Sequence, residues 1–141
     1  MALYTANVAQ EVAPESGVVF TDTETPCPFG FVLHQNETAT FRIRGVSRNR
    51  WARYEVHFQG NVALAGTVVA PISVAIATEG ETIPTSIATV TPAAVDTFTH
   101  IHTDSEVLVP VPCCSSISVR NIGTTPITIQ NASIRIQKVG A

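Results

Sequence analysis

The chain has 141 residues and a net charge of −3, and only 13% of its residues are charged, about half the usual share of roughly 25%. An isoelectric point near 5.7 argues against a general nucleic-acid binder, which usually carries a basic face, so we expect no nucleic-acid partner. No apolar stretch reaches the roughly 20 residues that span a bilayer, so we expect no transmembrane segment and no membrane partner.

The length suits one domain, residues 1–141, because domains most often have about 100–150 residues. No linker, low-complexity tract or internal repeat divides the chain. Its first 14 residues lack the charged and apolar regions of a signal peptide, so we expect none. Because charged residues normally lie at the surface, the surface of this chain must carry unusually few of them. Either Thr, Ser, Asn and Gln cover that surface, or other copies of the chain do.

The residue types favour strands throughout. Thr and Val are the most frequent residues and Ile is abundant, and branching at Cβ suits a pleated sheet better than a helix. No segment has a 3.6-residue period long enough to predict a helix. The sequence therefore predicts an all-β chain.

Alternation of apolar and polar residues marks the individual strands. The first ten residues alternate, and in residues 40–44 Phe41 and Ile43 face away from the neighbouring arginines. The same period of two recurs in residues 54–59, 71–78, 116–120, 127–130 and 134–137. Turn signals rich in Pro, Gly, Asn and Glu separate these segments. The pattern predicts about ten short strands in an antiparallel β-sandwich or barrel.

The C-terminal stretch carries a recognisable pattern: residues 117–129 read Ile-Ser-Val-Arg-Asn-Ile-Gly-Thr-Thr-Pro-Ile-Thr-Ile, and residues 132–136 read Ala-Ser-Ile-Arg-Ile. These residues resemble the closing strands of a C1q/TNF-like jelly-roll domain. In the tips of bacterial collagen-like spore-surface proteins, a strand with an Arg-Asn or Lys-Asn turn likewise leads into a final β-ribbon. The resemblance implies a jelly-roll that trimerises about a threefold axis. This chain departs from those proteins in having no Gly-X-Y stalk and no charged tail.

The order of elements from residues 1–10 through 54–56 to 91–95 is similar to that of small proteins encoded by phages and prophages of gut Firmicutes. This resemblance implies a structural virion protein, such as a capsid-decoration, head-fibre or fibre-tip subunit. It would assemble as a homotrimer in the host cytoplasm and contact capsid or other virion proteins. Two alternatives remain open: a lectin-like module that binds a host-surface glycan or receptor, and a bacterial surface or spore-coat structural protein.

One short segment holds most of the positive charge. Residues 42–53 contain five of the eight Lys and Arg residues, and Trp51 lies among them. Arg and Trp are enriched at binding hot spots. We therefore predict a partner-binding surface made of Arg48, Arg50, Trp51 and Arg53. A solvated turn flanked by arginines is the simpler alternative.

His100 and His102 are candidates for metal binding. In a strand they project from one face about 7 Å apart, and a threefold axis would bring together one histidine from each of three chains. No Cys or acidic residue lies at a recognisable ligand spacing from the pair, although Asp96 and Asp104 flank it. We therefore expect no bound metal or other cofactor. The simpler interpretation is that both are outward polar residues, at a subunit interface or on an open strand face.

The three cysteines cannot all pair within one chain, and without a secretion signal we expect reduced thiols. Cys113 and Cys114 are expected to be small buried hydrophobes after the turn at residues 110–112, with a bond to Cys27 as the alternative.

No catalytic motif is present in the sequence. We find no Gly-x-Ser-x-Gly elbow, no His-Glu-x-x-His, no phosphate loop and no dinucleotide fingerprint. The acidic residues are scattered singly in turns. We therefore expect no catalytic residues and no enzymatic activity.

Overall fold

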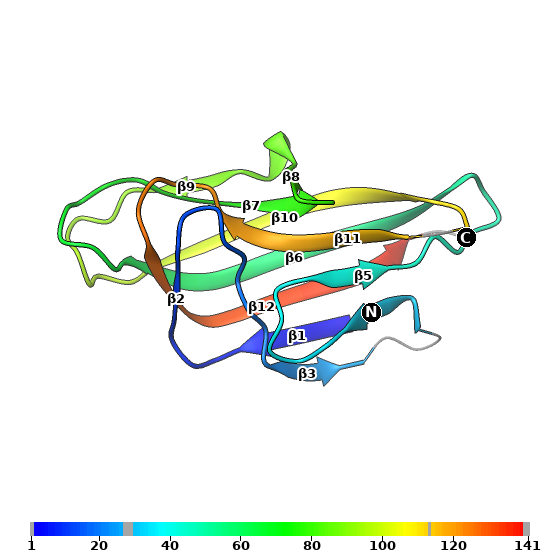
Figure 1. Cartoon of the computed structure of the whole chain (residues 1–141), viewed down its shortest axis with the longest axis horizontal. Helices are drawn as coiled ribbons and strands as arrows, with labels where there is room; N and C mark the ends of the chain where they lie inside the picture. The colour runs from blue at the N-terminus through cyan, green and yellow to red at the C-terminus, as the bar shows by residue number, and fades with distance from the viewer. Residues whose placement is uncertain (1, 27–29, 113, 140–141) are drawn as a thin grey trace.

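A computed structural model describes residues 2–26, 30–112 and 114–139 (Figure 1). The chain forms two antiparallel sheets of six strands each, and the longer strands follow the long axis of the molecule. Sheet A contains β1 (Ala2–Ala6), β2 (Gln10–Val12), β3 (Asp22–Thr25), β6 (Trp51–Leu64), β10 (Thr99–Pro110) and β12 (Ile127–Val139). Sheet B contains β4 (Val32–His34), β5 (Phe41–Ile43), β7 (Ile72–Thr78), β8 (Glu81–Thr82), β9 (Ala88–Val90) and β11 (Ser115–Asn121). A 3₁₀ turn occupies Pro84–Ser86.

The strand order differs strongly from the chain order. Sheet A runs β10-β6-β12-β1-β3, with β2 paired to β12, and sheet B runs β4-β5-β11-β7-β8, with β9 paired to β7. The inner faces of both sheets contribute to one hydrophobic cluster. This is an antiparallel β-sandwich with jelly-roll order, as the sequence predicted. No helix in the described residues is long and apolar enough to span a membrane.

The long strand β6 shows why the sequence folds this way. Its odd-numbered residues from 51 to 59 are exposed and its even-numbered residues from 52 to 60 are buried. Tyr54, Val56 and Phe58 therefore enter the core, while Glu55 and His57 point outward. The predicted alternation is confirmed, although the strand begins earlier and ends later than residues 54–59. Trp51, which the sequence placed in a basic turn, is its first residue.

An aromatic cluster joins the two sheets. Phe20, which follows β2, lies with its ring centroid 5.4 Å from that of Phe41 in sheet B and 6.4 Å from that of Phe58 in sheet A. Tyr4 of sheet A approaches Phe41 to 4.8 Å. All four side chains are at most 3% exposed. Each such pair stabilises the fold by about 0.5–1.5 kcal/mol beyond the burial of its surface.

The final predicted ribbon, residues 127–137, is a single strand with a bulge. The register between β12 and β6 shifts between Gln130 and Ser133, and Asn131 in this interval has a positive φ of 53°. Bulges of this kind add one unpaired residue and bend the strand. The outward side chains therefore change from even-numbered to odd-numbered positions along β12.

Asn121 is a buried polar side chain that connects distant segments. Its Nδ2 donates to the carbonyl oxygens of Val12 at 3.1 Å and Thr125 at 3.0 Å. Its Oδ1 accepts from the backbone N–H of Gly123 at 3.0 Å. The side chain is 0% exposed, so water cannot replace these bonds.

We expect Asn121→Ala to lower the free energy of unfolding by about 3 kcal/mol, because it leaves buried backbone groups without partners. Thermal unfolding at fixed protein concentration measures the change, expected as a fall in Tm of roughly 10 °C. Asn49→Ala, at an exposed position, is the matched control and should leave Tm unchanged. Equal behaviour of the two variants would contradict this role for Asn121.

Candidate functional site

The outward side chains of sheet A form a continuous surface that no other part of the described chain covers, here named the outer face of sheet A. The register of β6 with its neighbours arranges these side chains in rows. His100 lies opposite Asn61, and His102 lies opposite Gln59. On the other side of β6, Gln130 pairs with Asn61 and Ser133 pairs with Gln59. These six residues, which we name the neutral half, include no Lys, Arg, Asp or Glu.

The next rows of the same face carry charges. Asp104 and Arg135 flank His57 on neighbouring strands, and Glu106 lies opposite Glu55. We name this the charged half of the outer face. The alternation of the strands could predict which side chains face outward. Only the register shows that neutral and charged side chains are separated along the strands.

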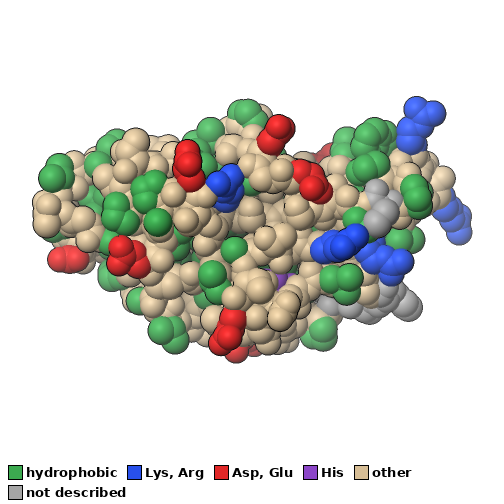
Figure 2. Space-filling model, viewed as in Figure 1, with side chains coloured by type: hydrophobic (Ala, Val, Ile, Leu, Met, Phe, Trp, Pro, Cys, Tyr) green, Lys and Arg blue, Asp and Glu red, His purple; other side chains and the backbone are tan. Residues whose placement is uncertain are grey.

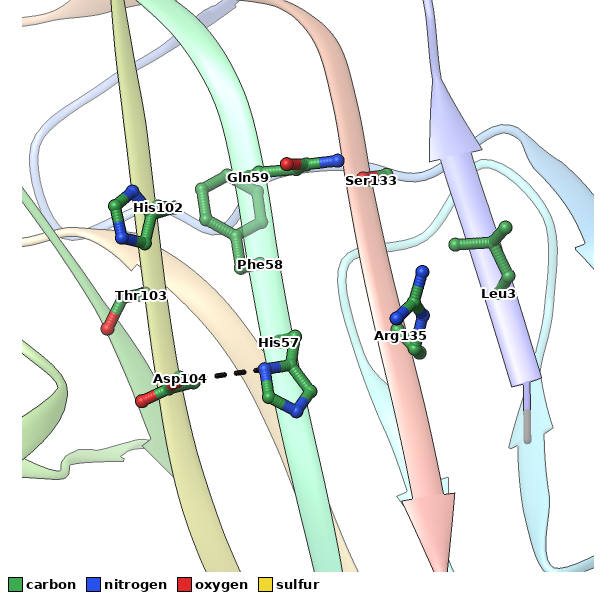
Figure 3. Close-up of a pocket in the computed structure, with 9 residues that line it drawn as sticks. All are labelled: Leu3, His57, Phe58, Gln59, His102, Thr103, Asp104, Ser133 and Arg135. Carbon is green, nitrogen blue, oxygen red and sulfur yellow. Dashed lines mark ion pairs between the residues drawn. The ribbon is translucent and has the colours of Figure 1, made fainter.

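A shallow depression of about 300 Å³ lies across the boundary between the two halves (Figure 3). His57 faces two carboxylates, with Nδ1 3.7 Å from Oδ2 of Asp104 and Nε2 3.8 Å from Oε2 of Glu55. The guanidinium of Arg135 points along β12 toward Ser133. Neither His57 nor Arg135 is among the site residues predicted from the sequence. They lie 78 residues apart in the chain, and only strand pairing brings them together.

His100 and His102 lie on one face of β10, as predicted. Their rings stack with centroids 6.0 Å apart and planes inclined by 28°, and both side chains are exposed. Nδ1 of His100 lies 3.4 Å from Oδ1 of Asn61. Within residues 2–26, 30–112 and 114–139, no group of three His, Cys, Asp or Glu residues is placed to hold a metal ion.

The arginines of residues 42–53 do not form one patch. Arg42 and Arg44 belong to sheet B, at β5 and directly after it, whereas Arg53 lies on the outer face of sheet A. Arg53 is bound to Glu106, with three N···O distances of 3.0–3.2 Å. Both side chains are about half exposed, and exposed pairs of this kind contribute less than about 1 kcal/mol.

Arg48 and Arg50 lie in the connection between β5 and β6. Neither side chain has an ion-pair or hydrogen-bond partner in the described part of the chain. In the view of Figure 2, most of the visible Lys and Arg side chains lie toward the end of the molecule where Figure 1 places the connection between β5 and β6. Of the four predicted partner-binding residues, Arg53 is already paired with Glu106. Arg48, Arg50 and Trp51 remain together where this connection meets β6.

Exposed apolar side chains surround these arginines. Trp51 is 46% exposed and lies opposite Pro110, and Leu108, two residues earlier in β10, is 49% exposed. Val46 and Val111 are 40% and 37% exposed. We name this region the basic–apolar end; it comprises Val46, Arg48, Arg50, Trp51, Leu108 and Val111.

The backbone of this connection is fixed by buried contacts. Tyr54 Oη donates to the carbonyl oxygen of Arg44 at 2.6 Å, and the N–H of Val111 donates to that of Arg50 at 3.1 Å. A Cβ added at Gly45 would lie 2.1 Å from the carbonyl oxygen of Pro110, so only glycine fits there. Arg48 and Arg50 therefore extend from an anchored loop, directly before Trp51 at the start of β6.

Cys114 is part of a disulfide bond and is half-buried. The expectation of reduced thiols is therefore wrong for Cys114. Cys27 and Cys113 lie outside the described residues, so the expected roles of those two cysteines stay predictions.

No protein-family model and no curated protein sequence matches this chain. Solved structures, however, are similar to it in fold. The Eiger TNF of S. frugiperda is 12% identical, with a TM-score of 0.70 over 99% of this chain and 91% of that one. The globular domain of zebrafish complement 1qA protein is 8% identical, with a TM-score of 0.59 over 99% of this chain and 96% of that one. At such identities the likeness shows the fold alone. The chain therefore has the TNF/C1q-like jelly-roll fold that its C-terminal stretch predicted.

Proposed function

We propose that this chain is a structural subunit of a bacteriophage or prophage virion, in a capsid decoration, head fibre or fibre tip, and that it assembles as a homotrimer. The observation that carries the proposal is the open outer face of sheet A, which spans β10, β6, β12 and β1. Assembly through this face would explain how a chain with only 13% charged residues covers its surface.

The distribution of charge on this face suits threefold symmetry. Near a threefold axis every side chain meets two copies of itself, so charged groups repel their equivalents. Two like charges 4 Å apart repel by about 4 kcal/mol at an effective dielectric constant of 20. The neutral half carries no such group, whereas the charged half offers both signs for contacts away from the axis. A trimer centred on the neutral half avoids this cost.

The virion role is supported by sequence resemblance and by chemistry together. The order of elements is similar to that of small phage and prophage proteins, and a jelly-roll that can trimerise, the fold implied by the separate C-terminal resemblance, is compatible with such a role. A sheet face, rather than a deep cleft, is the main open feature of the described residues. Such a face fits a protein whose task is to bind other protein surfaces.

A lectin-like binding module is the second candidate. It is favoured by the basic–apolar end, where Trp51 is exposed beside the unpaired guanidinium groups of Arg48 and Arg50. An exposed aromatic ring with cationic neighbours is suited to an anionic glycan or receptor segment. This surface is separate from the neutral half, so one chain could assemble and bind.

The trimer is tested by Gln59→Arg, which places a charge in the middle of the neutral half. Light scattering coupled to size exclusion should give about three times the chain mass of 15.0 kDa for the native protein and one chain mass for the variant. Thr89→Arg, at an exposed position on β9 of sheet B, is the matched control and should remain trimeric. A native protein that is monomeric at micromolar concentration would refute the trimer.

The virion role is tested on particles released from a host strain that carries the gene. Quantitative mass spectrometry of gradient-purified particles should find the chain at a fixed number of copies per particle, and that number should be divisible by three. A strain with the gene deleted is the control. Particles that lack the chain would exclude the virion role but leave the trimer standing.

The lectin alternative predicts that the native protein binds a defined set of anionic oligosaccharides on a glycan array. Trp51→Ala should reduce that binding at least tenfold, because it removes the exposed ring. Leu33→Ala, which shortens a 50% exposed side chain of sheet B, should have no effect. An array without signal, or equal binding by both variants, would argue against this function.

A further inference from the structure

We propose that His100 and His102 of three copies together form a binding site for a divalent transition-metal ion on the threefold axis. The proposal rests on the homotrimer described above and adds a ligand class to it. It departs from the expectation drawn from the sequence, which favoured ordinary outward polar residues and no bound metal at these two histidines.

The geometry of the pair allows both rings to reach one ion. Their centroids are 6.0 Å apart, the planes differ by only 28°, and both rings project into open space from the same strand face. Metal–nitrogen bonds of about 2.0–2.1 Å require the two ligating atoms to lie within roughly 4.2 Å of each other. Both side chains are exposed, so a rotamer change of His102 toward His100 would shorten the distance between their ring nitrogens.

The neighbouring residue Asn61 orients one of the rings for ligation. Its Oδ1, which can only accept a hydrogen bond, lies 3.4 Å from Nδ1 of His100. This contact favours the tautomer with the proton on Nδ1, which leaves the lone pair on Nε2 free to bind a metal. Metal-ligating histidines commonly donate their second nitrogen in this way.

One chain cannot complete the site. Two imidazoles are too few for a stable site, and no third His, Cys, Asp or Glu of the described residues joins the pair. The missing ligands must therefore come from other copies. The position of the pair permits this, because β10 is the last strand in the order of sheet A and its outer side chains are uncovered.

The neutral side chains beside the two histidines suit a position near the threefold axis. Asn61, Gln59, Gln130 and Ser133 share its two rows and are all neutral, so three copies can approach here without like charges meeting. The nearest acidic residue along β10, Asp104, belongs to the charged half. The donors are thus imidazoles without carboxylates, a set that suits Ni²⁺, Zn²⁺, Cu²⁺ or Fe²⁺ rather than Ca²⁺ or Mg²⁺.

The test measures metal content and mass on the same sample. The full chain, purified without a histidine tag, is incubated with Ni²⁺ or Zn²⁺, freed of loose metal, and analysed by light scattering and by elemental mass spectrometry. We expect one ion per three chains, in the trimer. His100→Ala and His102→Ala should each lower the metal content at least tenfold, and His57→Ala, on the adjacent strand of the same face, should keep it.

The outcomes separate the metal site from the trimer. A native trimer without metal, or a loss in His57→Ala equal to that in His100→Ala, overturns the site and leaves the trimer standing. A native monomer that holds one ion per chain overturns both. If an alanine variant does not fold, His100→Gln and His102→Gln keep the size of the side chain, and circular dichroism confirms that they fold before metal is measured.

Discussion

The pairing of β6 with both β10 and β12 is the constraint on which the arrangement of sheet A depends. Its buried positions Tyr54, Val56 and Phe58 pack into the core, so a slip of one residue would bring His57 and Glu55 inward instead. Burying those groups without partners would cost several kcal/mol, which fixes the register. This register also determines which side chains share a row on the outer face of sheet A, and it therefore separates the neutral from the charged side chains.

The two ends of this face suit different kinds of contact. The neutral half offers amides, a hydroxyl and imidazoles, which would tolerate the self-contacts of the proposed trimer. The basic–apolar end has Trp51 and Leu108 exposed beside Arg48 and Arg50, which is the composition of a surface that meets a different molecule. Separate surfaces allow assembly and recognition to be altered independently by substitution.

Much of the fold could be predicted from sequence, because alternation in β6 and β12 reports burial directly. The C-terminal resemblance supplied the jelly-roll order, which alternation does not contain. The site was harder to predict. Arg42 to Arg53 are close in sequence, yet they are divided between two sheets, while His57 and Arg135 are distant in sequence and adjacent in space. The register of β6 with β12 and the bulge at Asn131 depend on contacts between segments distant in sequence, which a local pattern cannot show.

Because Cys114 is part of a disulfide bond, its oxidation state depends on whether the surroundings of the protein are reducing or oxidising. Glutathione and thioredoxin keep thiols reduced in a bacterial cytoplasm, so under the virion role proposed above a newly synthesised subunit would begin with a free thiol at this position. Lysis of the host would then expose it to oxygen, and the bond would close in subunits that had already been assembled. The oxidation state of Cys114 would then distinguish newly made subunits from those of released particles.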